Sequence, residues 1–152
     1  MTHKDQAALK PIALHHALER IWGTKPGWGR LAAVNHNVIG CRLMLTALMF
    51  FAVGGILAML IRTQLASSQS AFMDAETYAQ VFTMHGSIMM FLFAIPFFEG
   101  MAIYLLPKLL GTRDLAFPRM GAYGYWCYLF GGLMLLAALL GGVAPSSGWF
   151  MY

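Results

Sequence analysis

The chain has 152 residues, of which 59% are hydrophobic and 11% are charged, and its formal net charge is +4. Its mean hydropathy of +0.64 is too high for a soluble domain of this size, which excludes an ordinary water-soluble enzyme. The positive charge does not indicate a nucleic-acid partner, because the basic residues flank long apolar runs. We therefore predict an all-α membrane protein that does not bind nucleic acid.

The first segment, residues 1–36, is predicted to be a cytoplasmic tail. It is polar and basic and has no short apolar core of the kind that marks a secretory signal, so we expect it to be retained. Leu14, Leu18 and Ile21 recur at helical spacing after Pro11. This pattern is compatible with a short amphipathic helix on the inner membrane surface, or with a loosely ordered arm.

Three uncharged runs are each long enough to cross a bilayer as a helix: Leu43–Ile61, Thr77–Phe98 and Gly121–Ala144. Lysine and arginine gather before the first run and between the second and the third, so the positive-inside rule places the N-terminus inside and the C-terminus outside. The predicted transmembrane helices are 37–62, 77–107 and 121–144, with an outer loop at 63–76, an inner loop at 108–120 and an outer segment at 145–152.

Glycines and prolines predict how these helices pack. Pro96 lacks an amide hydrogen and crowds the carbonyl of Leu92, so a kink is expected there, and Pro107 is expected to end the second helix. Cys41 and Cys127 form no C-x-x-C pair, so packing is their expected role. Close helix approach is predicted at three glycine pairs, Gly54-Gly55, Gly131-Gly132 and Gly141-Gly142.

His85 is the most informative residue, because an ionisable ring inside an uncharged span requires a partner. Imidazole is a common ligand of haem iron, and the adjacent Gly86 would leave room for a flat macrocycle against the helix. A histidine that is hydrogen-bonded to a neighbouring helix explains the pattern equally well. The spacing alone leaves both interpretations open.

An ordered series of motifs runs through the second and third spans: Phe82-Thr83-Met84-His85-Gly86, Ile88-Met89-Met90-Phe91, Ile95-Pro96, Leu105-Leu106-Pro107, Arg113-Asp114, Ala116-Phe117-Pro118-Arg119 and Tyr125-Trp126. This series resembles subunit I of the haem-copper oxygen reductases, and of cytochrome c oxidase in particular. The resemblance does not include the segment before Leu31. It implies that the three spans are the first part of a twelve-helix fold.

The resemblance also implies a role for each matching residue. His85 occupies the position of an axial ligand of the low-spin haem, expected to be haem a. Arg62 occupies the position of an arginine at the haem periphery, with a snorkelling arginine at the outer interface as the alternative. The opposite axial ligand must come from later helices, because His36 lies at the inner end of its span. The His15-His16 pair resembles the family's copper ligands only superficially, since it lies in the tail.

Asp114 resembles the acidic mouth of the family's proton-uptake channel, and the alternative is a solvated carboxylate. Many family members have asparagines where this chain has Ile103 and Gly121. Glu99 is an unusual acid for its position. It is either an alternative protonatable group, or a carboxylate near the inner interface that is hydrated or paired with Lys108.

For the whole subunit, the resemblance implies a respiratory oxidase that reduces oxygen to water and translocates protons. The high-spin haem and copper would be held by later helices, so this chain carries no catalytic residue and is not expected to be active alone. The implied partners are the remainder of subunit I, subunits II and III, and cytochrome c, in a bacterial inner membrane. A subunit I that is fused to subunit III is a further expectation.

Cytochrome c is favoured over quinol as the electron donor. Family members that bind quinol have charged or histidine side chains where this chain has Val53, Leu57 and Thr77, and only Gln80 matches their set. Two other classes of function stay open at this point. One is a membrane interaction protein without catalytic activity, and the other is a small proton-conducting or transport bundle that uses His85, Glu99 and Asp114 as a relay.

Overall fold

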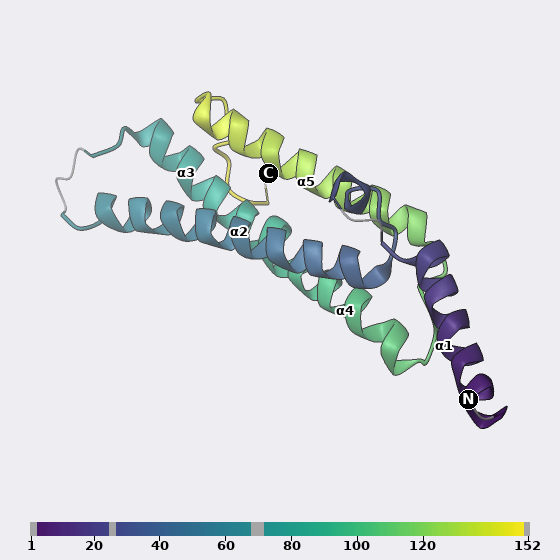
Figure 1. Ribbon diagram of the computed structural model, residues 1–152. Coiled ribbons are helices and arrows are strands. Elements are labelled where there is room, and N and C mark those ends of the chain that lie inside the picture. The colour runs from purple at the N-terminus through teal and green to yellow at the C-terminus, as the bar shows by residue number, and fades with distance from the viewer. Residues whose placement is uncertain (1–2, 25–26, 68–71, 151–152) are drawn as a thin grey trace. The chain divides into compact units, whose positions relative to one another are not determined.

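The chain is helical throughout its regular structure, with no strand among the residues that the structure describes (Figure 1). A computed structural model describes residues 3–24, 27–67 and 72–150. The chain divides into two compact units, Met1–Ala33 and Val34–Tyr152. The second unit holds all the predicted spans.

The first unit consists of a helix and a short 3-10 turn. Helix α1 covers His3–Trp22 with Pro11 inside it, so it begins earlier than predicted, and η1 covers Gly27–Arg30. The arm is thus helical, and Leu14 and Leu18 are exposed on it. The side chain of Ile21 lies outside the described residues. Binding of this helix to a membrane surface stays a prediction.

Three helices of the second unit are long and apolar enough to cross a membrane, as predicted. The first is α2, His36–Gln64. The second is continuous over α3 (Ala75–Ser87), the π-helical segment η2 (Ile88–Ala94) and α4 (Ile95–Leu109). The third is α5, Pro118–Leu140, which ends before the predicted residue 144 because Gly142 adopts a positive φ of 68° that a helix cannot continue.

Helices α2 and α3 begin at residues whose side chains satisfy free amides, and α5 begins at a proline. The Asn35 side chain accepts a hydrogen bond from the Asn37 amide at 2.8 Å, and the Asp74 carboxylate accepts from the amides of Glu76 and Thr77. Pro118 begins α5, where its missing amide hydrogen costs nothing.

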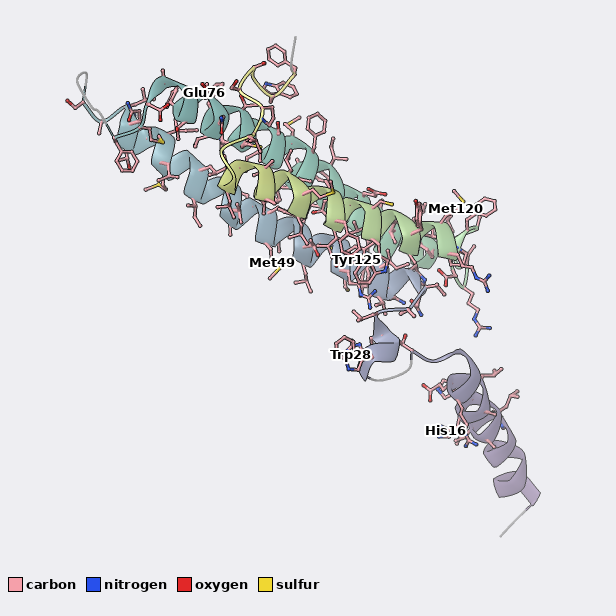
Figure 2. All side chains as sticks on the ribbon, turned by 90° about the horizontal axis from the view of Figure 1, so that it is seen from above. His16, Trp28, Met49, Glu76, Met120 and Tyr125 are labelled. Carbon is pink, nitrogen blue, oxygen red and sulfur yellow. The ribbon has the colours of Figure 1, made fainter. Side chains whose placement is uncertain are left out.

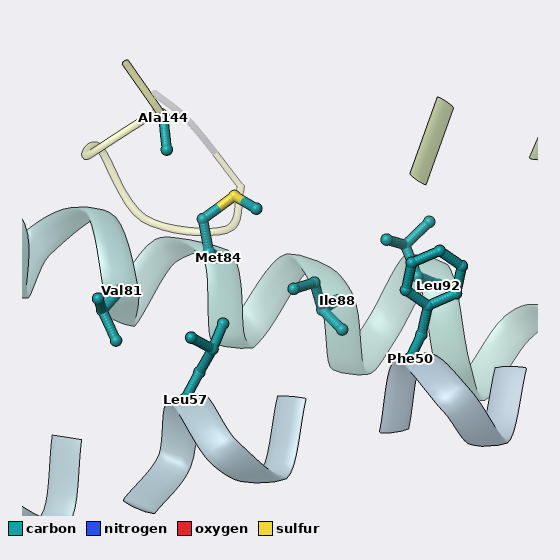
Figure 3. Close-up of a cluster of buried hydrophobic side chains, with 7 residues drawn as sticks. All are labelled: Phe50, Leu57, Val81, Met84, Ile88, Leu92 and Ala144. Carbon is teal, nitrogen blue, oxygen red and sulfur yellow. The ribbon is translucent and has the colours of Figure 1, made fainter. Parts of the chain in front are cut away.

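Helix α2 lies along the whole second span, and α5 lies beside both (Figure 1). One apolar cluster joins Phe50 and Leu57 of α2 to one face of α3 and η2, as Figure 3 shows. A smaller cluster, nearer the start of α2, is built on Ile39, Leu43 and Tyr125. Most other large apolar side chains face outward, as expected for helices that contact lipid.

Glycines set the closest helix contacts, but only some of the predicted ones do so. A Cβ on Gly54 would lie 2.7 Å from Met89 Sδ, and one on Gly132 would lie 2.5 Å from Phe50 Cζ. Gly55 and Gly131 face open space. A close backbone contact that we did not predict lies between α2 and α4, where a Cβ on Gly100 would lie 2.9 Å from the Gly40 carbonyl oxygen and 2.8 Å from Leu43 Cβ.

Two other expectations about single residues were wrong. Pro107 does not end the second helix, which continues through it to Leu109. Cys41 and Cys127 do not pack inside the bundle, because both side chains are exposed. The break expected at Pro96 takes the form of the π-helical segment that directly precedes it.

Substituting Gly100 with alanine should destabilise the bundle by about 1–3 kcal/mol, because the new methyl group must push apart two backbones. Thermal unfolding of the detergent-solubilised protein measures this. Gly55→Ala is the matched control, since its methyl group meets no neighbour and helix propensity favours alanine. Equal effects of the two substitutions would contradict the packing argument.

The first turn of α3 should be sensitive to pH. Hydrogen bonds from the side chain and backbone of Thr77 lower the pKa of Asp74 below its ordinary value of 3.8. The stabilisation is therefore present above the unfolded-state pKa and is lost as the pH falls through the lowered folded-state pKa. We expect amide protection at Glu76 and Thr77, measured by hydrogen exchange, to fall in acid. Asp74→Asn should remove that pH dependence; if the dependence survives, another group causes it.

Candidate functional site

His85 lies in the last turn of α3, and its ring is oriented by the neighbouring span. Its Nδ1 lies 2.9 Å from the carbonyl oxygen of Gly54 in α2. A carbonyl can only accept, so Nδ1 carries the proton and donates it. In the neutral ring Nε2 then keeps its lone pair, which is the state needed to bind a metal. The ring is partly exposed, and the hydrogen bond to a neighbouring helix is formed, whereas the role of His85 as a metal ligand stays a prediction.

The segment after α5 packs against the same part of α3. The Gly148 amide donates to the Thr83 hydroxyl at 2.9 Å, and Thr83 is fully buried. A Cβ on Gly86 would lie 2.9 Å from Trp149 Cβ. The expectation that Gly86 leaves room for a macrocycle is therefore wrong, because the missing side chain makes room for Trp149. Any ligand must approach His85 from another side.

Arg62 lies near the Gln64 end of α2 and is exposed. At about 1.5 Å per residue, the step along the helix from Gly54 to Arg62 is about 12 Å. The two residues of the predicted haem site therefore lie at different depths, His85 at the level of Gly54 and Arg62 closer to the helix end. A group that contacts both would have to extend along the helix axis.

Asp114 and His36 meet at the opposite end of α2. The Asp114 Oδ1 atom lies 3.2 Å from His36 Nδ1, and it also accepts from the backbone amides of His36 at 3.3 Å and Leu115 at 2.9 Å. The carboxylate therefore caps α2 as well as pairing with the imidazole. His36 is buried, and its Nε2 has no hydrogen-bond partner among the described residues. We did not predict this contact, and no local sequence signal joins two residues so far apart in the chain.

The same geometry separates His36 from the His85 site. The step from His36 to Gly54 is about 27 Å along α2, which is most of the thickness of a bilayer core. His36 is thus too distant to bind a metal that is held by His85. His15 and His16 belong to the first unit, where both are exposed and lie near Glu19, at 3.4 Å and 3.5 Å. Within the described residues, no group of three or more potential ligands could hold a metal ion.

Glu99 is exposed on α4 and takes part in no ion pair within the described part of the chain. Pairing with Lys108, one of the expected alternatives, is not among the described ion pairs, and the Lys108 ammonium lies over the Tyr104 ring, 3.1 Å from its centroid. Ile103, where many family members have asparagine, packs against the cluster of Ile39, Leu43 and Tyr125. Glu99 is therefore not brought together with Asp114 or His85 by any observed contact.

Comparison with known proteins confirms the resemblance that the motifs indicated. The family described as "Cytochrome C and Quinol oxidase polypeptide I" matches residues 38–152. Cytochrome c oxidase subunit 1 of Bacillus subtilis is 43% identical over 126 residues, covering 82% of this chain and 20% of the relative. The heme-copper oxidase subunit I+III of Aeropyrum pernix is 42% identical over 123 residues, covering 80% and 15%. Cytochrome c oxidase subunit 1 of Corynebacterium efficiens is 38% identical over 147 residues, covering 96% and 25%.

The fold and these matches define a helical membrane protein of the haem-copper oxidase class. The chain belongs to the cytochrome c and quinol oxidase polypeptide I family. It spans only about a fifth of the length of the relatives that it matches.

Proposed function

We propose that this chain is the part of a cytochrome c oxidase subunit I that supplies one axial ligand of the low-spin haem, through His85. The observation that supports this most directly is the hydrogen bond from His85 Nδ1 to the Gly54 carbonyl. It leaves Nε2 as the atom with a free lone pair and fixes the plane of the ring before any ligand binds.

The donor set fits one face of a haem. The described residues offer a single oriented imidazole at this depth, and in this proposal a second ligand would be supplied by polypeptide outside these three spans. Arg62, near the end of α2, would approach the polar edge of the same group. A haem held in this way supplies reversible one-electron transfer. In this proposal the chain holds and orients the His85 ring, and its packed apolar side chains exclude water.

Replacing His85 with alanine should remove the low-spin contribution to the reduced-minus-oxidised spectrum of the intact oxidase, because the iron loses an axial ligand. Signals from the high-spin haem should persist. His15→Ala, an exposed histidine of α1, is the control and should leave the spectrum unchanged. A full low-spin band in His85→Ala would refute the assignment.

We propose further that Asp114 is the entry point for protons on the inner side, with His36 as its first partner. Their contact at 3.2 Å supports this, as does the buried His36 Nε2 atom without a described partner, the kind of atom that an ordered water serves. Beyond His36, α2 carries the polar side chains of Asn37, whose buried Oδ1 has no hydrogen-bond partner among the described residues, and Arg42, whose guanidinium lies 5.8 Å from the Tyr125 ring centroid. The next hydroxyl pair, Thr46 and Tyr125 at 3.2 Å, lies about 15 Å further along the helix axis.

Asp114→Asn should slow proton uptake from the inner side and oxygen reduction by about tenfold, equivalent to about 1.4 kcal/mol on the barrier. The amide keeps an oxygen to accept from the His36 and Leu115 amides, so the helix cap and the haem spectrum should be retained. Glu76→Gln, a carboxylate at the far end of the bundle from Met120 (Figure 2), should have no effect on turnover. Normal turnover in Asp114→Asn would exclude this residue as the entry point, and a second arm with Glu99→Gln would then test Glu99 as the protonatable group.

Cytochrome c is the proposed electron donor. Gln80, which alone matches the quinol-binding set, is buried and donates from Nε2 to the Gly142 carbonyl at 3.2 Å. A side chain held in that way supports the end of α5 and does not face a quinol. The proposed partners are the remaining helices of subunit I, subunits II and III, and membrane lipid, with a copper and a high-spin haem bound outside this chain. The proposed location is a bacterial inner membrane, with the Asp114 end of the bundle inside.

A further inference from the structure

The second span has a backbone carbonyl that its own helix cannot satisfy in the normal way. In an α-helix the carbonyl of Leu92 would accept from the amide of residue 96, but that residue is proline and has no amide hydrogen. Both Leu92 and Pro96 are buried. A carbonyl without a donor is costly at membrane depth, because no water replaces the lost bond.

Tyr128 of α5 supplies the missing donor. Its hydroxyl donates to the Leu92 carbonyl at 2.6 Å. The ring that carries this hydroxyl is held edge-on against Phe50, with 5.7 Å between ring centroids. Phe50 in turn packs on Gly132, where a Cβ would lie 2.5 Å from the Phe50 ring. Three spans therefore meet around one hydrogen bond, and the packing leaves the tyrosine little freedom to move away.

The acceptor of this bond belongs to the π-helical segment Ile88–Ala94, which directly follows the helix that carries His85. A π segment changes the rotation between the helices on its two sides, so its geometry determines which face of α3 is turned toward α2. The His85 ring reaches the Gly54 carbonyl only if that rotation is maintained. The Tyr128 bond holds the π segment from outside the helix.

We propose that Tyr128 is a positioning residue for the His85 site: its hydroxyl replaces the donor lost at Pro96 and fixes the turn of the second span that aims His85. This inference rests on the proposed role of His85 as a haem ligand. Tyr128 touches neither the ring of His85 nor a ligand of it in the observed contacts, so its effect is transmitted through the backbone between Leu92 and His85.

Tyr128→Phe in the intact oxidase tests the hydroxyl with the ring retained. We expect a shift in the midpoint potential of the low-spin haem, a broader low-spin electron paramagnetic resonance signal and a lower thermal unfolding midpoint. Tyr123→Phe is the matched control, because Tyr123 is an exposed tyrosine on the same helix. That control should change none of the three measurements.

Pro96→Ala gives the discriminating arm, since alanine restores the amide hydrogen that would serve the Leu92 carbonyl when the segment takes up the α-helical register instead of the π register. Adding Tyr128→Phe to Pro96→Ala should then produce little further change in potential, line width or stability. Equal effects of Tyr128→Phe in both backgrounds, or no effect in either, would overturn the inference. If Tyr128→Phe alone does not assemble, the inference predicts that the double variant with Pro96→Ala and Tyr128→Phe does. A double variant that also fails to assemble would count against the inference.

The outcomes also separate this inference from the proposed function. If the low-spin band keeps its wild-type size in His85→Ala, His85 is not the haem ligand. The unfolding midpoints of the Tyr128→Phe and Pro96→Ala variants would still measure the contribution of the Tyr128 hydrogen bond. If the low-spin band is lost in His85→Ala but the midpoint potential is unchanged in Tyr128→Phe, His85 is a haem ligand and Tyr128 does not position it.

Discussion

The hydrogen bond between the His85 ring and the Gly54 carbonyl is the interaction on which the proposed site depends. It needs α2 and the second span to lie close together, and in lipid that closeness comes from backbone contact more than from burial of apolar surface. The missing side chain of Gly54 admits Met89, and further along the helices Gly40 and Gly100 bring α2 and α4 into backbone contact. The glycines that shape the bundle are therefore also those that bring the histidine to its acceptor.

The requirement to satisfy every backbone polar group in a membrane explains two other features. At one end of α2, Asp114 accepts from the His36 amide and so closes the helix with a side chain from the loop after α4. In the middle of the second span, Tyr128 serves the carbonyl that Pro96 leaves without its α-helical donor. In both cases one side chain joins separate elements, which ties the geometry of a local break to the packing of the bundle.

The polar residues of the two proposed sites lie apart along the bundle. His85 and the Asp114–His36 pair lie at different depths of the bundle, and the cluster of Ile39, Leu43 and Tyr125 lies next to the latter. The proposed haem-ligand site and the proposed proton-entry site are therefore separated along α2. Between them the described residues place this cluster, to which Ile103 contributes, together with Arg42, whose guanidinium lies 5.8 Å from the Tyr125 ring centroid.

Composition and the three uncharged runs were enough to predict a helical membrane protein with three spans, and the ordered motif around His85 was enough to predict the family. These features are local, because a span is determined by its own apolar length and a motif by adjacent residues. The sequence could not show that Gly86 makes room for Trp149, that Gly40 meets Gly100, or that His36 pairs with Asp114. Nor could it show that Tyr128 completes the break at Pro96. Each of these joins residues on different elements, and only the rotation of each helix about its axis, which is set by the packing of the whole bundle, decides which side chains meet.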